Sequence, residues 1–279
     1  MKPALVTALL CVAATSAFGQ SWKTMDVSRQ VRDSGEHLVR VQYPVGRLTV
    51  RSTKEPVLYS MQLRYDEDRM RPLHSFDSLS RRLTVGFDAD RLRGRNARDN
   101  WEETELTLSL SESVPLDVAM EIGAAEARLD MGGLAITRLR VETGAAEARL
   151  DFSEPNKTRM RRLDVQLGAA DFVIRNLGNA NVASIRVDGG VGKVNLDFGG
   201  DIKDDVTVDA NVALGKLALR LPREVGVRVD VKRVIAAFDH HGLTRRGDSY
   251  YSDNWDEAKV RMRVRAETVF GAVEIDRTR

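Results

Sequence analysis

Cysteine is almost missing from this chain of 279 residues, because Cys11 is the only one. Cys11 lies in an N-terminal segment that we expect to be removed, so the remaining chain has no cysteine for a disulfide, a thiolate metal site or a cysteine nucleophile. An excess of one charge is missing too, since 43 basic residues nearly balance 41 acidic ones. Proteins that bind nucleic acid concentrate positive charge on one face, so we expect no nucleic-acid partner.

Aromatic residues and long apolar runs are also scarce. Aromatic side chains make up 6% of the chain, which is low for a large globular core and suggests many thin, similar layers. Beyond the N-terminus, no stretch approaches the roughly 20 apolar residues that a transmembrane helix needs. We therefore expect no transmembrane helix in the mature chain.

The first 19 residues have the parts of a secretory signal peptide. Lys2 provides the positive charge, the run from Ala4 to Ala14 is apolar, and Ala17-Phe18-Gly19 is an acceptable cleavage site. The apolar run is too short to cross a bilayer of about 30 Å as a helix. The residues before Cys11 are leucines, which do not form a lipobox. We expect cleavage before Gln20 and a periplasmic or secreted protein.

A short motif recurs along the chain. GAAEARLD occurs twice without change, and its relatives include GAADFVIR, GVGKVNLD, ALGKLALR and VFGAVEID. The copies start at Pro44, Gly123, Gly144, Gly168, Gly190, Ala213 and Val269. From Gly123 to Ala213 the spacings are 21, 24, 22 and 23 residues. Such a period is typical of repeat proteins, in which each unit buries its apolar face against its neighbours.

Apolar and polar residues alternate within each copy, which is the two-residue period of a half-buried strand. One set of inward positions contains Leu129, Leu150, Ile174, Leu196, Leu219 and Ile275. A second alternating run precedes each copy, as in Arg140-Val141-Glu142. Each unit is therefore expected to contain a strand, a tight Gly or Ala corner, a second strand and a loop.

Coils of this length, stacked about 4.8 Å apart, would align equivalent side chains into internal ladders. We therefore predict an all-β fold, specifically a β-solenoid. A leucine-rich repeat has a similar period, but it needs an Asn or Cys ladder and helices between its strands. A β-sandwich remains an alternative, although it does not require near-identical units.

The sequence divides into three parts, which are the signal peptide (1–19), a less regular N-terminal β region (20–112) and the repeat domain (113–279). The N-terminal region carries one corner motif, Tyr43-Pro44-Val45-Gly46. It is expected either to begin or cap the same stack or to form a separate small β-domain. Its charged stretch, residues 88–103, is typical of an exposed loop.

The longest interruption of the repeats follows Phe238 and reads DHHGLTRRGDSYYSDNWDEA. Loops on rigid scaffolds often carry function, and Arg and aromatic side chains are common anchors of binding surfaces. The candidate binding residues are His240, His241, Arg245, Arg246, Tyr250, Tyr251 and Trp255. Alternatively, these aromatic side chains cover the open end of the stack.

The succession VGVRVDVKRVIAAFDHHGLTRRGDSYYS, followed by VFGAVEID, resembles the end of the LiaF-type cell-wall-active antibiotic response domain, called toast-rack. The corners GAAEARLD and GVGKVNLDFGG are similar to the same domain and to related adhesin-type β-solenoid domains. The resemblance covers residues 113–279. It implies a right-handed β-solenoid (a single-stranded β-helix) in the bacterial envelope, linked in some relatives to sensing of cell-wall stress. It implies no catalytic residues, and the signalling relatives carry N-terminal transmembrane helices in place of a signal peptide.

An acidic column is the best enzymatic candidate, because β-helical lyases and hydrolases place carboxylates on such faces. Its members are Asp130, Asp151, Asp197 and Asp276, and Arg175 and Arg220 interrupt it. This alternation is better explained by ion pairs between neighbouring coils. Adjacent His240 and His241 lack a metal-binding spacing. We expect no catalytic residue, metal or cofactor.

The sequence therefore predicts a non-catalytic, exported bacterial envelope protein, a binding or scaffold module with a role in envelope stress or adhesion. An envelope protein or a glycan is the expected partner, and self-association through an uncapped end is a further option. The alternative is a β-helical carbohydrate-active enzyme, either a polysaccharide lyase or a hydrolase. A concave groove with two or three convergent carboxylates or basic residues and bound sugar would favour that alternative.

Overall fold

The computed structural model describes residues 21–88 and 103–278. The chain is all-β, as predicted, with sixteen strands in one sheet and a single-turn 3₁₀ helix, η3 (Leu177–Ala180), among the described residues. None of the described residues belongs to a helix long and apolar enough to span a bilayer. The predicted signal peptide and residues 89–102 of the predicted loop lie outside the described ranges.

The first six strands include four short ones and the long, bent β2. They are β1 (Trp22–Gln30), β2 (His37–Thr53), β3 (Val57–Asp66), β4 (Pro72–Asp77), β5 (Arg82–Phe87) and β6 (Glu105–Ser111). The repeat strands follow, namely β7 (Pro115–Asp130), β8 (Ala135–Thr143), β9 (Glu147–Asp151), β10 (Met160–Arg175), β11 (Val182–Asp197), β12 (Val206–Pro222), β13 (Gly226–His240) and β16 (Arg261–Thr278). A small hairpin, β14 (Thr244–Arg246) and β15 (Ser249–Tyr251), lies between β13 and β16.

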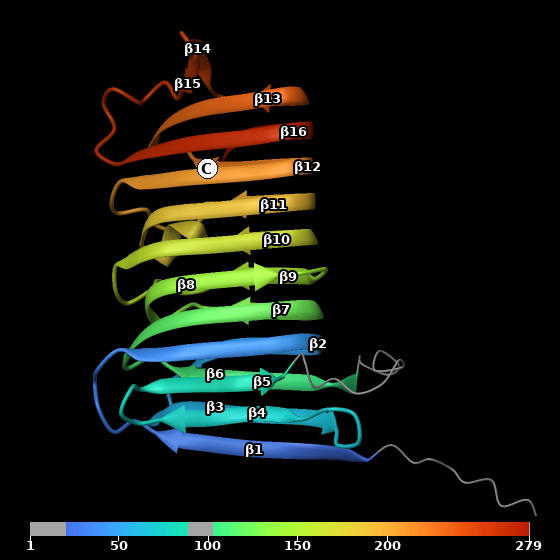
Figure 1. Cartoon of the computed structure of the whole chain (residues 1–279). Coiled ribbons are helices and arrows are strands. Elements are labelled where there is room, and N and C mark those ends of the chain that lie inside the picture. Colours follow the sequence, from blue (N-terminus) through green and yellow to red (C-terminus); the bar gives the residue numbers. More distant parts are fainter. Residues whose placement is uncertain (1–20, 89–102, 279) are drawn as a thin grey trace, which may run out of the picture.

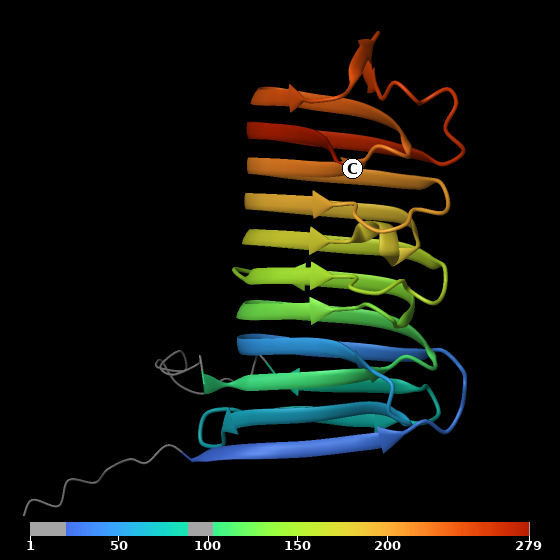
Figure 2. The same cartoon turned by 180° about the vertical axis from the view of Figure 1, so that it is seen from behind.

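The repeat strands lie parallel to one another, one per coil, and each bends at its corner into a first and a second arm (Figure 1, Figure 2). β8 and β9 together form one such coil, because β10 pairs with β8 along its first arm and with β9 along its second. The spatial order departs from the sequence order at one point. β16 inserts between β12 and β13, so β13 forms the last coil of the stack.

The predicted ladder of aliphatic side chains is confirmed. Leu129 is the register partner of Leu150, Leu150 of Ile174, and Ile174 of Leu196. All four side chains are at most 2% exposed and belong to one hydrophobic core. A fully buried Leu or Ile contributes roughly 1.5–3 kcal/mol relative to an exposed one, so repetition of the same position supplies much of the stability of the stack.

The corners differ in backbone conformation between coils. Gly192, Gly215 and Gly271 have φ values of 137°, 136° and 131°, which side chains rarely tolerate. A Cβ on Gly215 would lie 1.9 Å from the carbonyl oxygen of Gly192, in the preceding coil. Glycine is therefore required where neighbouring corners approach this closely.

The N-terminal strands join the same sheet. The two arms of β2 pair in parallel with β7 on one side, and with β5 and β6 on the other. Beyond them, β4 pairs antiparallel with β5, β3 with β6, and β1 with β3. Buried residues on both sides of residue 112 contribute to one core. The division into 20–112 and 113–279, and the right-handed coiling, stay predictions.

The sheet ends at β13. Its first arm pairs with β15 over Arg228–Asp230, and its whole length pairs with β16 on the other side. In the described part of the chain, no strand pairs with the outer edge of residues 231–240. Such an edge exposes backbone N–H and C=O groups that can hydrogen bond to another strand.

Candidate functional site

A groove with a volume of about 1410 Å³ runs along the corner of the stack. Eight coils each contribute three consecutive residues to its lining, from Gln42–Pro44 in β2 to Lys232–Val234 in β13. Because the coils are in register, chemically similar residues form rows along the groove. One row, here called the polar ladder, consists of Gln42, Glu121, Glu142, Gln166, Asp188, Asn211, Glu267 and Lys232.

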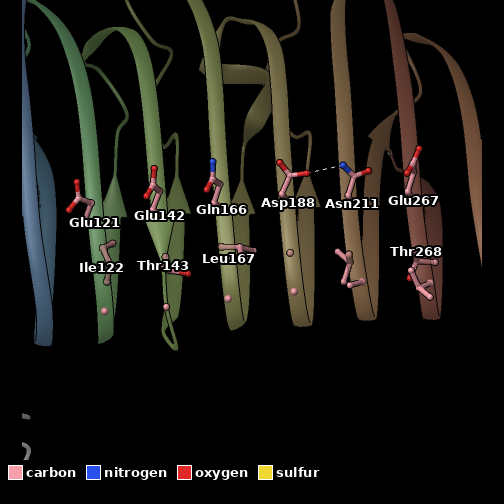
Figure 3. Close-up of a pocket in the computed structure, with 18 of the residues that line it drawn as sticks. Glu121, Ile122, Glu142, Thr143, Gln166, Leu167, Asp188, Asn211, Glu267 and Thr268 are labelled. Carbon is pink, nitrogen blue, oxygen red and sulfur yellow. Dashed lines mark hydrogen bonds between the residues drawn. The ribbon is translucent and has the colours of Figure 1, made fainter.

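Figure 3 shows six members of the polar ladder side by side on successive strands. Each of the eight lies two residues before the corner residue of its coil, on the outer face of the first arm. Strand alternation therefore directs all of them to the same side of the sheet. The lining contains five carboxylates, at Asp88, Glu121, Glu142, Asp188 and Glu267, and two cations, at Lys232 and Arg233.

Toward the β2 end of the polar ladder, Glu121 is held by neighbouring donors. One oxygen lies 2.5 Å from Arg40 Nη2, and Gln42 Nε2 donates to the other at 3.0 Å. These hydrogen bonds favour the ionised form and lower the pKa of the Glu121 carboxyl from its ordinary value. Glu121 is therefore an anion at neutral pH.

Asp188 is bound in a similar way. Burial alone would raise the pKa of its carboxyl, but hydrogen bonds from Arg186 at 2.6 Å and Asn211 at 2.8 Å outweigh it and lower the pKa. At the β13 end, Lys232 lies 3.1 Å from Glu267. Between these anchored groups, Glu142 and Gln166 make no hydrogen bond or ion pair with any described residue. They are the side chains most available to a ligand.

The floor of the groove is mostly apolar. Ile122, Leu167 and Val212 are buried directly behind the polar ladder. The same row contains Thr143 and Thr268, whose hydroxyl oxygens are buried without a hydrogen-bond partner in the described part of the chain. A buried polar group left unpaired costs about 1–3 kcal/mol, so these two threonines are weak points of the groove floor.

One rim of the groove is apolar toward its β13 end. Six large apolar side chains are exposed there, on four adjacent coils, and they are called the apolar rim below. They are Val191, Leu214, Val234, Ile235, Val269 and Phe270. Scattered exposed apolar residues are normal, but a continuous row indicates a surface that contacts another molecule.

Sequence analysis missed the polar ladder, although a signal existed. Every coil has a charged or amide residue two positions before its corner, and none has an apolar one. Alternation alone explains a polar residue at this position, since the outer face meets water. Only the in-register pairing of the coils shows that these side chains line a groove.

The predicted binding residues surround the hairpin at the end of the stack, and the structure brings them together in two groups. In the first, the ring of Tyr250 lies 4.7 Å from that of His240 and 4.9 Å from that of Phe238. Both Phe238 and Tyr250 pack against the hydrophobic core. These contacts are those expected of a cover over the last coil.

In the second group, the rings of Tyr251 and Trp255 lie 5.6 Å apart. The guanidinium of Arg246 lies 5.5 Å from the Tyr251 ring and also pairs with Asp256 at 2.9 Å. His241 and Arg245 lie outside both groups. His241 approaches Asp239 and Asp276 at 3.4 and 3.3 Å, and Arg245 bonds to the Gly247 carbonyl. Binding by this set stays a prediction.

The acidic column is aligned as the repeats indicate, with Asp151 opposite Arg175 and Asp197 opposite Arg220. The expected ion pairs between neighbouring coils do not occur in it, among the residues described. The carboxylates bind turn residues instead. Asp130 accepts hydrogen bonds from Ser153 and Gly132, Asp151 from Asn176, and Asp197 from Gly199. Within the described ranges, no three His, Cys, Asp or Glu side chains are grouped to hold a metal ion.

Similar chains occur among solved structures. A "putative cell adhesion protein" from Clostridium sporogenes is 20% identical, with 92% of this chain and 100% of that chain covered and a TM-score of 0.48. A "putative adhesin" from Bacteroides fragilis is 9% identical, with 91% and 98% covered and a TM-score of 0.37. A "putative adhesin" from Parabacteroides merdae is 10% identical, with 92% and 96% covered and a TM-score of 0.37. No curated protein matches this chain.

A family model matches residues 19–175 and is described as the N-terminal domain of toast_rack, DUF2154. The toast-rack resemblance is thereby confirmed, and the matched residues include the N-terminal β region that the resemblance itself did not cover. The match extends over more than half of the sequence. The chain belongs to the toast_rack family, through its N-terminal domain.

Proposed function

We propose that this protein is a non-catalytic binding module of the bacterial cell envelope that holds an elongated glycan in the corner groove. The observation that carries the proposal is the polar ladder, which presents one carboxylate, amide or ammonium group per coil along eight coils. A ligand with regularly repeated hydroxyl or amino groups can satisfy such a row one rung at a time. Export through the predicted signal peptide, residues 1–19, would place the protein in the periplasm or outside the cell.

A glycan is favoured over a folded protein partner by the shape and chemistry of the groove. The groove is long and narrow in composition, with the same three corner positions repeated at about 4.8 Å intervals. Carboxylates and amides provide the acceptors and donors that hydroxyl groups need, and the apolar floor provides contact area. Glu142 and Gln166, which have no partner among the described residues, would contact the ligand first.

Catalysis on the glycan is the second candidate, because the groove does hold several carboxylates. Hydrolysis requires a carboxylic acid that stays protonated near neutral pH, which means a raised pKa. Hydrogen bonds instead lower the pKa of Glu121 and of Asp188. The carboxylates also stand in one row and do not face one another across a bond to be cleaved. These features support binding without turnover.

The test compares Glu142→Ala and Gln166→Ala with a matched control, Glu147→Ala. Glu147 belongs to the same coil as Glu142 but lies exposed on the second arm, away from the groove. We expect soluble envelope oligosaccharides to bind the natural protein and the control equally. We expect each groove variant to bind at least about tenfold more weakly, as loss of one or two hydrogen bonds to a charged group implies.

Three results would contradict the proposal or redirect it. Retention of no envelope oligosaccharide by the natural protein would contradict glycan binding, and so would equal affinity of the groove variants. Mass spectrometry of the recovered oligosaccharides tests turnover. Intact chains support a binding module, whereas shortened or unsaturated products would favour the carbohydrate-active enzyme.

The hairpin residues are proposed to contact a second partner in the envelope. Their exposed members, Arg245 and Arg246, project from the end of the stack. The variant that tests this replaces residues 240–256 with a short Gly/Ser linker. A partner captured from envelope extract by the natural chain and lost by the variant supports the proposal, while identical partner sets would eliminate the hairpin as a binding site.

Self-association is proposed at the same end, through the open edge of β13 and the adjoining apolar rim. Val234 and Ile235, which are 73% and 64% exposed, lie on that edge strand. Val234→Lys would hinder edge pairing and expose less apolar surface. Sedimentation should show concentration-dependent dimers for the natural chain and monomers for the variant, and a natural chain that stays monomeric would contradict the proposal.

A further inference from the structure

A second pocket lies on the outer face of the first arms, beside the groove, and its lining is dominated by arginine. It has a volume of about 620 Å³ and is built by three consecutive coils. Five arginines and two aspartates line it, together with Gln166 and Ser184. The charged members are Arg138 and Arg140 in β8, Arg161, Arg162 and Asp164 in β10, and Arg186 and Asp188 in β11.

The register of the coils brings like charges face to face in this pocket. Arg138 is the register partner of Arg162 on the neighbouring parallel strand. Like charges directly opposite one another destabilise a sheet, so this arrangement calls for negative charge between them. The adjacent row shows the usual solution, because Arg140, Asp164, Arg186 and Asp209 alternate in sign from coil to coil.

The carboxylates of the protein only partly supply that negative charge. Asp164 pairs with Arg162 and Asp188 with Arg186, both at 2.6 Å. Asp117 and Glu36, outside the lining, approach Arg138 and Arg161 at the longer distance of 3.5 Å. Arg140 has no hydrogen bond and no ion pair with any described residue. The guanidinium groups of the pocket therefore have unused donors.

A similar pair of arginines elsewhere shows what is special about the pocket. Arg128 and Arg149 are also register partners on neighbouring coils. Each has a carboxylate two residues before it in its own strand, Glu126 at 2.5 Å and Glu147 at 3.8 Å. Neither arginine lines the pocket. That pair is neutralised by the protein itself and provides a natural control.

We propose that the arginine pocket binds a phosphate group. A guanidinium presents a planar set of N–H donors that matches the oxygens of phosphate, often in a bidentate way. A phosphate carries up to two negative charges on several oxygens, so one group can contact Arg138, Arg140 and Arg162 together, whereas a carboxylate offers only two oxygens. The phosphate would relieve the repulsion between Arg138 and Arg162 and occupy the donors of Arg140.

The site is separate from the proposed glycan groove, although Gln166 and Asp188 line both. An envelope polymer that carries phosphate could occupy both sites at once, and free inorganic phosphate could occupy the pocket alone. Both sources present the same group to the same arginines. Exposure of these side chains also means that salt screens the interaction, so binding should weaken as ionic strength rises.

The experiment measures binding of inorganic phosphate and of tripolyphosphate to the full mature chain by calorimetric titration at low ionic strength. Three proteins are compared, which are the natural chain, the pocket variant Arg138→Gln/Arg140→Gln and the control variant Arg128→Gln/Arg149→Gln. Both variants remove two exposed positive charges from facing or adjacent positions. Thermal melting checks that all three are folded.

We expect saturable binding to the natural chain, a loss of affinity of at least about tenfold in the pocket variant, and a change of less than about twofold in the control. Glu142→Ala should bind phosphate as the natural chain does, which separates this site from the glycan groove. Binding of tripolyphosphate that inorganic phosphate displaces would assign the shared phosphate group as the ligand. Absence of saturable binding, or equal loss in the control variant, would overturn the proposal.

Discussion

Two groups of coils form the same corner in different ways. In β7, β10 and the β8–β9 coil, the corner reads Gly-Ala-Ala and ends in Ala125, Ala170 and Ala146. In β11, β12 and β16, the final position is Gly192, Gly215 and Gly271, each with φ above 130°. Ala170 and Gly192 are nevertheless register partners. The stack therefore keeps its register across a change of corner conformation.

The two groups also differ in what they expose. The residue before the final corner position is alanine in the first group, as at Ala124 and Ala169. In the second group it is large and apolar, at Val191, Leu214 and Phe270, which are 44–53% exposed. A buried core requires none of these side chains. The comparison teaches that the core ladder is uniform along the stack, whereas the outer corner changes from a small surface to the apolar rim.

The largest expected effect tests whether the core is uniform across both groups. Leu150→Asp and Leu196→Asp place a carboxylate at equivalent ladder positions that are 0% and 1% exposed. A buried charge without a partner should lower the free energy of unfolding by more than about 4 kcal/mol, which abolishes cooperative folding. Circular dichroism melts should lose their transition in both variants. An unchanged melt for either one would refute its inward orientation.

The next effect separates the two kinds of corner. Gly215→Ala forces a side chain into a positive-φ conformation and against the carbonyl of Gly192, so we expect a loss of roughly 3 kcal/mol. Gly144→Ala is the matched control from the first group. Its Cβ would meet nothing closer than 3.6 Å, and its free energy of unfolding should change by less than about 1 kcal/mol. Denaturant unfolding measures both, and equal losses would show that the corners do not differ.

A smaller effect, of opposite sign, concerns the groove floor. Thr143, in the first group, and Thr268, in the second, each bury a hydroxyl without a partner. Thr143→Val and Thr268→Val keep the shape of the side chain and remove the unpaired group, so each should gain about 1 kcal/mol in denaturant unfolding. Loss of stability in either variant would mean that its hydroxyl does have a partner in solution.

The smallest effect depends on pH. Hydrogen bonds from Arg40 and Gln42 lower the pKa of the Glu121 carboxyl in the folded protein. A group with a lowered pKa stabilises the fold at pH above its ordinary pKa of about 4.3, and this stabilisation is lost as the pH falls through the folded value. The melting temperature of the natural chain should therefore fall more between pH 6 and pH 3 than that of Glu121→Gln. The difference should be small, because 43% of the Glu121 side chain is exposed, and identical acid profiles would contradict this role.

Most of the stack could be predicted from the sequence because its signals are local. Alternation in each copy identified the strands, and the fixed spacing aligned Leu129, Leu150, Ile174 and Leu196 into one ladder. The position of β16 could not be predicted, since nothing local shows that a returning strand inserts between β12 and β13. The two open strand edges of a stack have similar backbone groups, so sequence order alone would have placed β16 last.

The groove and the arginine pocket required the same missing information. Glu142 and Gln166 are 24 residues apart in the sequence, and Arg138 and Arg162 are also 24 apart. Each residue alone is an ordinary polar member of an outer face. Their chemistry becomes visible only when register places them side by side on neighbouring coils. The loop after Phe238 attracted attention because its composition was unusual, but the polar ladder repeats the composition of every coil.

The most direct test of the account cross-links rungs of the polar ladder, because every conclusion requires the coils to be in register. With Cys11→Ser as background, Glu142→Cys/Gln166→Cys places thiols on neighbouring strands about 4.8 Å apart, within the range of a disulfide. Glu142→Cys/Asp188→Cys places them two rungs apart, at roughly twice that distance. Mild oxidation should form the disulfide quantitatively in the first pair and not in the second. A first pair that stays reduced, or equal oxidation of both pairs, would contradict the in-register stack.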